Sequence, residues 1–395
     1  DEFEAGKLVE ISNVQWHSRR FHPTGEFIQV VGSPENPADD FTIVRKMFDL
    51  PEDFHDNILN QAEQLSLPNI EEIVKHRLDL RNKDIFTIDP LTAKDFDDAV
   101  SLEIIDENLM ELGVHIADVS FFVREGSALD KIAYDRTASC YLGDNVIPML
   151  PEKLSNELCS LKPNVPRLAY SVLMRITKTG VVRQYKIVES VIQSKKRFTY
   201  EEAQEIIDKR EGVFAEQLIQ MNKLHKTLLN KRTKKGSIDF DIPEPIFKFD
   251  KNGRPIGISK SERKDTNRLI EDFMLLANKV VATHIATQAN QENFPFIYRI
   301  HETPSEDKIN NLYNTLASLG IKTEKPTGKF TPLDMQKILA QIKDTPFANF
   351  IEQISLRSMT KAVYSTHNLG HFGLAFQNYT HFTSPIRRYP DMIAH

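Results

Sequence analysis

Cysteine is scarce in this sequence, and long apolar runs are missing. Only Cys140 and Cys159 occur among 395 residues, which excludes a disulfide framework and a metal site built from thiolates. We therefore expect a reducing, cytoplasmic compartment. No run approaches the roughly 20 apolar residues that a membrane span needs, and the start, DEFEAGKLVE, lacks the basic-then-apolar pattern of a secretory signal. These absences predict a soluble protein with no membrane partner.

A net positive charge is also absent. The chain has 50 Lys and Arg against 56 Asp and Glu, a formal net charge of −6, whereas phosphate binding draws its affinity from Lys and Arg. Basic residues are nevertheless concentrated in SKKRF (194–198) and KRTKKG (231–236), and acidic residues near 50–60 and 89–111. Such runs are usually solvated surface. The other interpretation is a charged channel for nucleic acid.

The length is sufficient for two or three domains of roughly 150 residues each. Within residues 1–49, the segments KLVEI, EFIQVV and FTIVRK alternate apolar and polar positions, which predicts three short antiparallel strands. Such a segment is part of a barrel, and we expect a partial OB-type β module that binds nucleic acid. A helical linker is expected over 50–80, and a larger domain over 81–395.

The larger domain changes from strand patterns to helix patterns along the chain. Three short β-rich segments lie between residues 84 and 119, a helix is expected over 127–142, and two long strands over 168–198 should form a hairpin through the turn Lys-Thr-Gly. Strands first and helices later indicate an α+β fold with a mixed, antiparallel-rich β core surrounded by helices. Helices are predicted at roughly 200–235, 265–289, 305–319, 333–342 and 347–366, with a last one starting at Ser384 and Pro385 as N-cap and N1.

Four aspartates stand close together in TIDPLTAKDFDDAVSLE, namely Asp89, Asp95, Asp97 and Asp98. Neighbouring carboxylates raise one another's pKa values unless solvent or a cation screens them, and Mg²⁺ prefers carboxylate oxygens. An exposed acidic loop is the usual alternative. Here apolar residues alternate with the acids, so the loop should lie against a core. Pro90 also restricts the preceding aspartate to an extended backbone.

The segment IDPLTAKDFDDAV closely resembles the signature of the RNB family, the ribonuclease II and ribonuclease R exonucleases. Further sequence blocks resemble that family in the same order over about residues 80–395, and these blocks are more similar to ribonuclease R than to ribonuclease II. Residues 1–49 look like the tail of the family's second cold-shock-type OB domain. The further blocks are HIADVSFFV, VIPMLPEKLSNELCSLKP, NRLIEDFMLLAN, YRIHETPS and GHFGLAFQNYTHFTSPIRRYPDM.

This resemblance implies a Mg²⁺-dependent, processive 3′-to-5′ hydrolase that degrades single-stranded RNA to nucleoside 5′-monophosphates. Two Mg²⁺ ions are expected during catalysis, with Mn²⁺ as a substitute. The family's earlier OB domain, its C-terminal OB domain and the last helices of the RNB domain are missing, so we expect a chain truncated at both ends. The activity of such a truncated chain is left open, and a monomer is expected.

The resemblance also assigns roles in the chemistry. Asp89, Asp95, Asp97 and Asp98 match the family's metal-site aspartates, and Asp95 and Asp97 are expected among the catalytic residues. Arg387 in SPIRRYPD matches the catalytic arginine, whose guanidinium can clamp a phosphate oxygen. Neighbouring residues of a strand point to opposite faces. Asp97 and Asp98 should therefore differ, one binding metal and the other orienting water or a second ion.

Other residues match the family's contacts with RNA. Tyr141 and Phe240 match an aromatic pair that stacks terminal bases, an interaction that tolerates every base. Glu271 matches an RNA-contacting glutamate, and a carboxylate can accept a hydrogen bond from a ribose 2′-hydroxyl. Arg387 belongs to this group as well, because it would contact the phosphate. Without the resemblance, both aromatic residues would be assigned to the core.

Some alternatives remain open. His115 and Asp118 fit either metal ligation or a buried structural hydrogen bond, and the structural role is the commoner one. The chain as a whole fits two further functions: a non-catalytic single-stranded RNA-binding protein on the same scaffold, and a metal-dependent phosphohydrolase for small nucleotides. The four aspartates together with Arg387 disfavour the first, and the basic and aromatic features disfavour the second.

Overall fold

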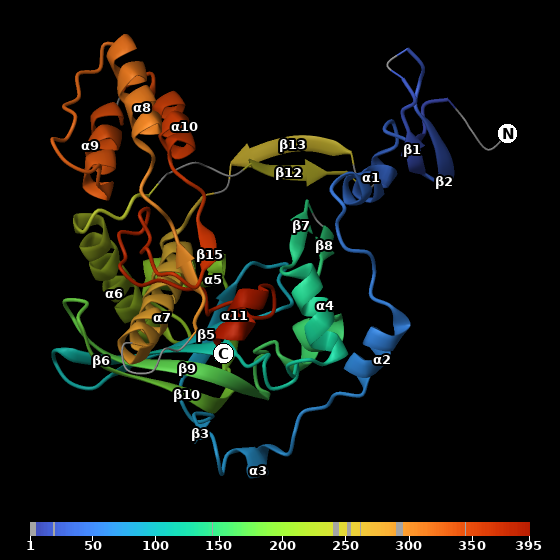
Figure 1. The fold of residues 1–395 in the computed structure, drawn as a ribbon. Coiled ribbons are helices and arrows are strands. Elements are labelled where there is room, and N and C mark those ends of the chain that lie inside the picture. Colours follow the sequence, from blue (N-terminus) through green and yellow to red (C-terminus); the bar gives the residue numbers. More distant parts are fainter. Residues whose placement is uncertain are drawn as a thin grey trace. The chain divides into compact units, whose positions relative to one another are not determined.

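The structure is a computed structural model in which the chain divides into two compact units. Unit 1 comprises Asp1–Asn57, Ser139–Pro148 and Pro243–Glu262, and unit 2 comprises Ile58–Ala138, Met149–Ile242 and Arg263–His395 (Figure 1). The described residues are 5–18, 20–143, 145–239, 245–250, 254–260, 262–289, 295–343 and 345–395. Within these ranges, none of the helices has both the length and the apolar character that crossing a bilayer requires.

Unit 1 begins with a hairpin followed by a helix. Its first elements are β1 (Leu8–Gln15), β2 (Thr24–Gly32) and α1 (Asp40–Met47). β1 and β2 pair antiparallel as predicted, but the prediction of a third strand over FTIVRK is wrong, because this segment lies in α1. A turn at Pro37 precedes the helix, and the side chain of Asn36 accepts a hydrogen bond from the Ala38 N–H at 3.3 Å. A capping residue followed by proline starts a helical turn rather than a strand.

The remaining described elements of unit 1 are two short ribbons. They are β7 (Cys140–Leu142) with β8 (Asn145–Ile147), and β12 (Pro245–Phe249) with β13 (Pro255–Lys260). The predicted helix over 127–142 is therefore too long. It corresponds to α4 (Ala128–Arg136) of unit 2, which ends before Thr137, whose φ of 63° breaks the helical backbone. The assignment of residues 1–49 to an OB-type domain stays a prediction.

Unit 2 is built on a seven-stranded sheet in the order β11-β4-β5-β6-β9-β10-β3. Its strands are β3 (Leu78–Asp79), β4 (Ile85–Asp89), β5 (Asp98–Ile104), β6 (Leu109–Ala117), β9 (Pro166–Thr177), β10 (Val182–Gln193) and β11 (Lys196–Thr199). Four neighbouring pairs are antiparallel, and the two outer pairs, β11 with β4 and β10 with β3, are parallel. The predicted α+β fold with a mixed, antiparallel-rich sheet is confirmed. Gly180, with φ of 70°, permits the turn between β9 and β10.

Three helices cover one face of this sheet (Figure 1). They are α5 (Tyr200–Lys209), α6 (Ala215–Lys234) and α7 (Asp265–Ala289). Buried Val100, Leu112 and Val172 of the sheet share one core with Leu218 of α6 and Phe273 of α7. The helix predicted over 265–289 is confirmed. The one predicted over 200–235 is two helices, because the chain turns through left-handed Arg210 (φ 61°) between them.

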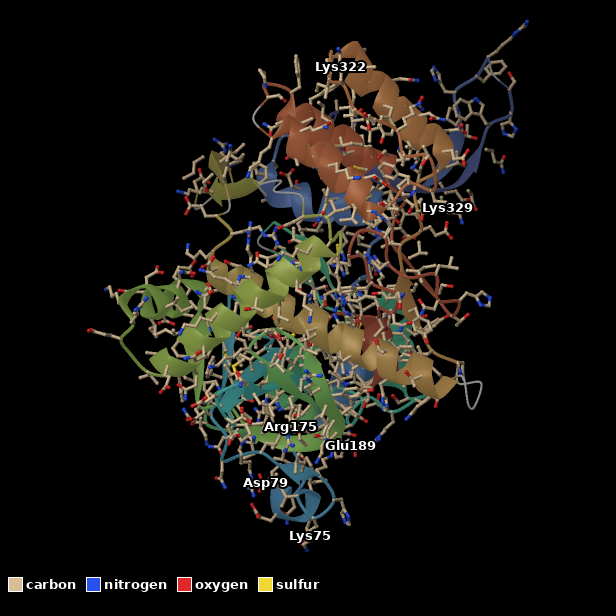
Figure 2. All side chains as sticks on the ribbon, turned by 90° about the vertical axis from the view of Figure 1, so that its left-hand side faces the viewer. Lys75, Asp79, Arg175, Glu189, Lys322 and Lys329 are labelled. Atoms are coloured by element: carbon tan, nitrogen blue, oxygen red, sulfur yellow. The ribbon has the colours of Figure 1, made fainter. Side chains whose placement is uncertain are left out.

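A second group of helices in unit 2 has its own apolar core. It consists of α8 (Glu306–Ser318), α9 (Pro332–Ile342) and α10 (Ala348–Ser358). The strands β14 (Tyr298–Ile300) and β15 (Val363–Ser365), which flank these helices in the chain, pair antiparallel. The helix predicted over 347–366 ends eight residues early, and β15 follows it. In Figure 2, Lys322 and Lys329 mark the segment between α8 and α9, while Arg175 and Glu189 mark the β9–β10 hairpin.

The last helix begins later than predicted. Residues 385–387 form a turn, and α11 (Tyr389–Ala394) starts after Arg388, which has an extended backbone. The prediction of a helix starting at Ser384 is wrong. Pro390 would lie inside such a helix, where it lacks the N–H and clashes with the preceding turn, whereas in α11 it occupies the first turn. Arg387 therefore belongs to a turn and not to a helix.

Candidate active site

The loop between β4 and β5 carries the four aspartates. Asp89 is the last residue of β4 and Asp98 the first of β5, while Asp95 and Asp97 belong to the loop. Asp89 is 8% exposed and Asp97 is 6% exposed. Phe96 between the acids is buried as well, which confirms that the loop lies against the core. The acidic run is thus not a solvated surface loop.

Burial is the main effect that destabilises the charged forms of the carboxylates in this loop. Burial, followed by the charge of Asp98, raises the pKa of Asp89 to about 7. Burial raises the pKa of Asp98 to about 6, although the charge of Arg387 opposes this. Burial also raises the pKa of Asp97, and Arg387 again opposes it. A nearby cation would return these groups to their charged forms.

Arg387 is brought to the aspartates from the far end of the chain. Its Nε lies 3.8 Å from Oδ2 of Asp97, and the main-chain N–H of Ile386 donates a hydrogen bond to Oδ1 of Asp97 at 2.9 Å. The structure therefore joins the two segments as expected, through the 385–387 turn instead of a helix. The turn thus fixes Asp97 through a direct hydrogen bond, whereas among the described residues it makes no such bond to Asp98, so the two neighbouring aspartates differ.

Asp391 holds the turn at residues 385–387, the arginine turn, and was missed by the sequence analysis. Its fully buried carboxylate accepts the N–H of Ser384 at 2.8 Å and two hydrogen bonds from the Arg388 guanidinium, at 2.9 and 2.6 Å. Arg387 in turn donates to the Ser384 hydroxyl at 3.1 Å. Arg388 is thus committed to the turn, while the side chain of Arg387 remains 42% exposed.

Arg197 is a second contributor that the sequence analysis left unassigned. It lies on β11 beside β4 and donates to the main-chain oxygens of Pro90 and Leu91 at 2.5 and 3.0 Å. Its charge also lowers the pKa of Asp89, against the larger effect of burial. The basic run SKKRF was the available signal, because it contains this arginine.

The donor set of the loop fits a hard divalent cation in its chemistry. Oδ2 of Asp89 is buried and has no hydrogen-bond partner among the described residues, and buried carboxylates with raised pKa values are stabilised by a bound cation. The described side chains do not form a preassembled cage of three or more His, Cys, Asp or Glu ligands. Asp89, Asp95 and Asp98 are accordingly candidate ligands that a cation would draw together.

The residues expected to contact RNA are distributed over both units. Tyr141 lies on β7 of unit 1, and its side chain is 52% exposed rather than in the core. Glu271 lies on α7 of unit 2 and accepts a hydrogen bond from Arg263 at 2.5 Å, with Arg232 at 4.0 Å. Phe240 lies outside the described residues.

His115 and Asp118 have structural partners. Ser190 donates to the Ala169 carbonyl, so Ser171 must donate to Ser190 and accept from Nδ1 of His115. Nε2 of His115 then accepts from the hydroxyl of Ser101 at 3.0 Å. The carboxylate of Asp118 pairs with Arg77 at 2.6 Å. The commoner, structural interpretation of both residues is the one found.

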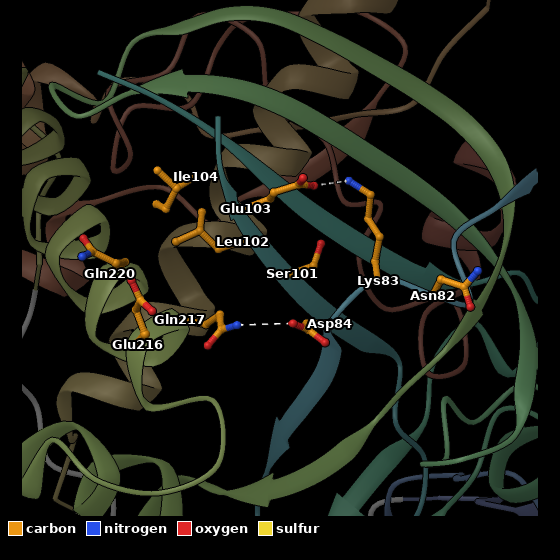
Figure 3. A pocket seen from close by; sticks show the side chains of 10 residues that line it. All are labelled: Asn82, Lys83, Asp84, Ser101, Leu102, Glu103, Ile104, Glu216, Gln217 and Gln220. Atoms are coloured by element: carbon orange, nitrogen blue, oxygen red, sulfur yellow. Dashed lines mark hydrogen bonds and ion pairs between the residues drawn. The ribbon is translucent and has the colours of Figure 1, made fainter. Parts of the chain in front are cut away.

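A separate polar pocket of about 400 Å³ lies beside Ser101 (Figure 3). Lys83 pairs there with Glu103 at 2.7 Å, and Gln217 donates to Asp84 at 3.4 Å. Lys83 and Glu103 thus neutralise one another, and Asp84 is bonded to a neutral amide. The pocket lining includes none of the four aspartates of the β4–β5 loop among the described residues.

Comparison with known proteins identifies the family. The RNB domain model matches residues 77–395. Ribonuclease R of Aquifex aeolicus is 42% identical over 99% of this chain and 56% of its own length. Ribonuclease R of Mycoplasma genitalium, solved with double-stranded RNA, is 29% identical with a TM-score of 0.92, over 100% of this chain and 70% of that one. Its complex with ribose-methylated single-stranded RNA is 30% identical with a TM-score of 0.89, over 94% and 58%.

The matches cover nearly all of this chain but only part of each relative. The chain spans about half the length of the curated relatives that it matches. The seven-stranded sheet, the aspartate loop and the turn at residues 385–387 nevertheless fall within residues 77–395, which the RNB domain model matches. The chain belongs to the RNB family, within which it is similar to ribonuclease R.

Proposed function

We propose that this chain carries the catalytic centre of a 3′-to-5′ exoribonuclease that hydrolyses single-stranded RNA to nucleoside 5′-monophosphates. The observation that carries the proposal is the hydrogen bond from Ile386 to Asp97, because it joins the aspartates to Arg387. The similarity to ribonuclease R supports the substrate class. Magnesium dependence and processivity are parts of the same proposal.

The side chains would divide the chemistry between them. Bound divalent cations in such a site activate water and neutralise charge on the phosphate, and Asp89, Asp95 and Asp98 would hold them. Asp97 has one carboxylate oxygen occupied by the Ile386 N–H, so its other oxygen is left to orient water or a cation. The guanidinium of Arg387, on a partly exposed side chain, would clamp a phosphate oxygen and stabilise the charge that develops there.

Substrate binding would use the residues that match the family's RNA contacts. Tyr141 has the exposure that base stacking needs, and Phe240 would be its partner. Glu271 would accept the ribose 2′-hydroxyl, and its pairing with Arg263 would orient the carboxylate. A monomer suffices for this proposal, with residues 1–49 as a partial OB-type module, 50–80 as linker and 81–395 as catalytic domain.

A labelled RNA tests the proposal. The purified chain is incubated with 5′-labelled single-stranded RNA and Mg²⁺, with EDTA as the metal-free arm, beside Asp97→Asn and the control Asp135→Asn, an exposed aspartate of α4. We expect stepwise shortening to a short remnant with release of monophosphates, lost in EDTA and in Asp97→Asn but kept in the control. Internal fragments, or equal cleavage by Asp97→Asn, would contradict the proposal.

A further inference from the structure

A cavity of about 320 Å³ lies between α6, α7 and the turn of the β9–β10 hairpin. Its walls are largely apolar, with Val182 from β10, Leu228 from α6, and Leu276 and Val280 from α7. The aromatic ring of Phe376 adds to this lining. None of the four aspartates of the β4–β5 loop is among the described residues that line the cavity, so it is distinct from the candidate active site.

The cavity is strongly cationic in a chain with a net charge of −6. Asp272 is the one carboxylate in its described lining, and its two oxygens are occupied by Arg232 at 2.9 Å and by His225 at 2.6 Å. The remaining cationic side chains of the lining therefore face the cavity without a carboxylate partner there. These are Arg183, Lys231, Lys235 and Lys279.

Two of the lysines are held in place by contacts that leave their charge unneutralised. Nζ of Lys231 donates to the main-chain oxygen of Gly180 at 2.8 Å, and Nζ of Lys279 lies 4.8 Å from the ring centroid of Phe376. Burial, followed by the charge of Lys235, lowers the pKa of Lys231, and burial with the charges of Lys235 and Lys231 lowers that of Lys279. Like charges so confined are stabilised by a bound anion.

We propose that this cavity binds a small organic phosphate of the nucleoside monophosphate class. The phosphate would lie among Lys231, Lys235 and Lys279, and the flat base against the apolar wall near Phe376. A phosphomonoester carries about −1.5 to −2 charges at neutral pH. It therefore neutralises several ammonium groups better than one phosphodiester of a nucleic-acid backbone, which has a single negative charge. A volume near the lower end of the range for small-molecule pockets, roughly 300 to 1,000 Å³, fits one nucleotide. This binding does not depend on the proposed cleavage of RNA.

Calorimetric titration with AMP tests the site in the intact chain. EDTA is present throughout, so that divalent cations cannot bridge AMP to the aspartates. Lys279→Met and Lys231→Met remove a charge from the cavity, and Lys234→Met is the matched control, because Lys234 is an exposed residue of the same α6 outside the lining. We expect the first two to weaken AMP binding about tenfold, the loss of one charge-assisted contact, and the control to leave it unchanged.

Further ligands separate the phosphate from the base. Adenosine and inorganic phosphate should each bind at least about tenfold more weakly than AMP, since each fills one half of the site. Lys279→Met should unfold at the same or a higher temperature than the native chain, because the substitution relieves repulsion between the lysines. A loss of AMP binding in this variant would therefore not be caused by unfolding. No AMP binding to the native chain, an equal loss in Lys234→Met, or equal competition by an unphosphorylated DNA oligonucleotide would overturn the proposal.

Discussion

Ile386 and Asp97 are joined by a main-chain to side-chain hydrogen bond of 2.9 Å, although 289 residues separate them in the sequence. The bond is buried, and it fixes one oxygen of a carboxylate whose pKa is raised by burial. It also places the next residue, Arg387, 3.8 Å from the other oxygen. Fixing the peptide therefore fixes the arginine relative to the aspartates.

Replacing Arg387 with alanine should abolish most of the proposed cleavage while leaving the fold intact. Its side chain is 42% exposed and contributes one hydrogen bond to the turn, whereas removing a charge stabiliser of the transition state costs about 10²- to 10³-fold in rate. Single-turnover cleavage at saturating protein measures the effect. Arg175→Ala, on the exposed side of the β9–β10 hairpin, is the control. An equal decrease in both variants would contradict the assignment.

Asp391 should act as a positioning residue. Asp391→Ala leaves the Arg388 guanidinium and the Ser384 N–H without their acceptor, and breaking a buried ion pair from one side costs about 3 to 5 kcal/mol. Urea denaturation should show this loss in the free energy of unfolding. The rate of cleavage should fall more than RNA affinity does, because Arg387 is displaced. Unchanged stability would show that the turn does not need Asp391.

Magnesium should stabilise the folded chain. Burial and the charge of Asp98 raise the cost of ionising Asp89. Mg²⁺ that binds the native state alone would therefore raise its stability by mass action. Thermal unfolding in Mg²⁺ against EDTA measures this shift. Asp98→Asn should unfold at a higher temperature than the native chain in EDTA but lose the shift, whereas Asp135→Asn should keep it. A native chain that unfolds at the same temperature in both buffers would argue against a metal site.

His115 should make the fold sensitive to acid. Burial, with the charge of Lys83, lowers its pKa to about 3, below the value near 6.5 of an unfolded chain. Because the folded pKa is the lower one, its contribution is complete above about pH 6.5 and is lost as the pH falls from there toward 3. His115→Asn should be less stable at pH 7.5 but lose less stability between pH 7 and pH 5. Urea midpoints at both pH values decide this, and parallel curves would contradict it.

The fold and the site were predictable from sequence to different degrees. Periodicity was sufficient for the mixed sheet and for α7, because buried strands and long amphipathic helices have strong local patterns. The segment FTIVRK was misassigned, since a strand-like alternation competed with the helix start at Asn36 and Pro37. The turn at residues 385–387 depends on the buried carboxylate of Asp391, and no local pattern reveals such a contact.

Within the site, the sequence predicts that the four aspartates lie close together, but it does not predict which residues bond to them. The four aspartates are close in the sequence, so their clustering follows from the β4–β5 connection. Arg197 reaches the loop only because β11 pairs in parallel with β4, and the pairing of strands so far apart depends on the whole sheet. Asp97 and Asp98 were expected to differ by strand alternation, and the physical difference found is the hydrogen bond from Ile386.

The arginine turn has a consequence for the timing of synthesis. Ribosomes add about 5 to 20 residues per second, so roughly 15 to 60 s pass between the addition of Asp97 and that of Ile386, 289 residues later. Throughout this interval the nascent chain carries the acidic loop without its arginine. A growing chain would therefore be unable to assemble an RNA-cutting centre beside the message that encodes it, and the proposed activity would begin only once translation has passed the turn.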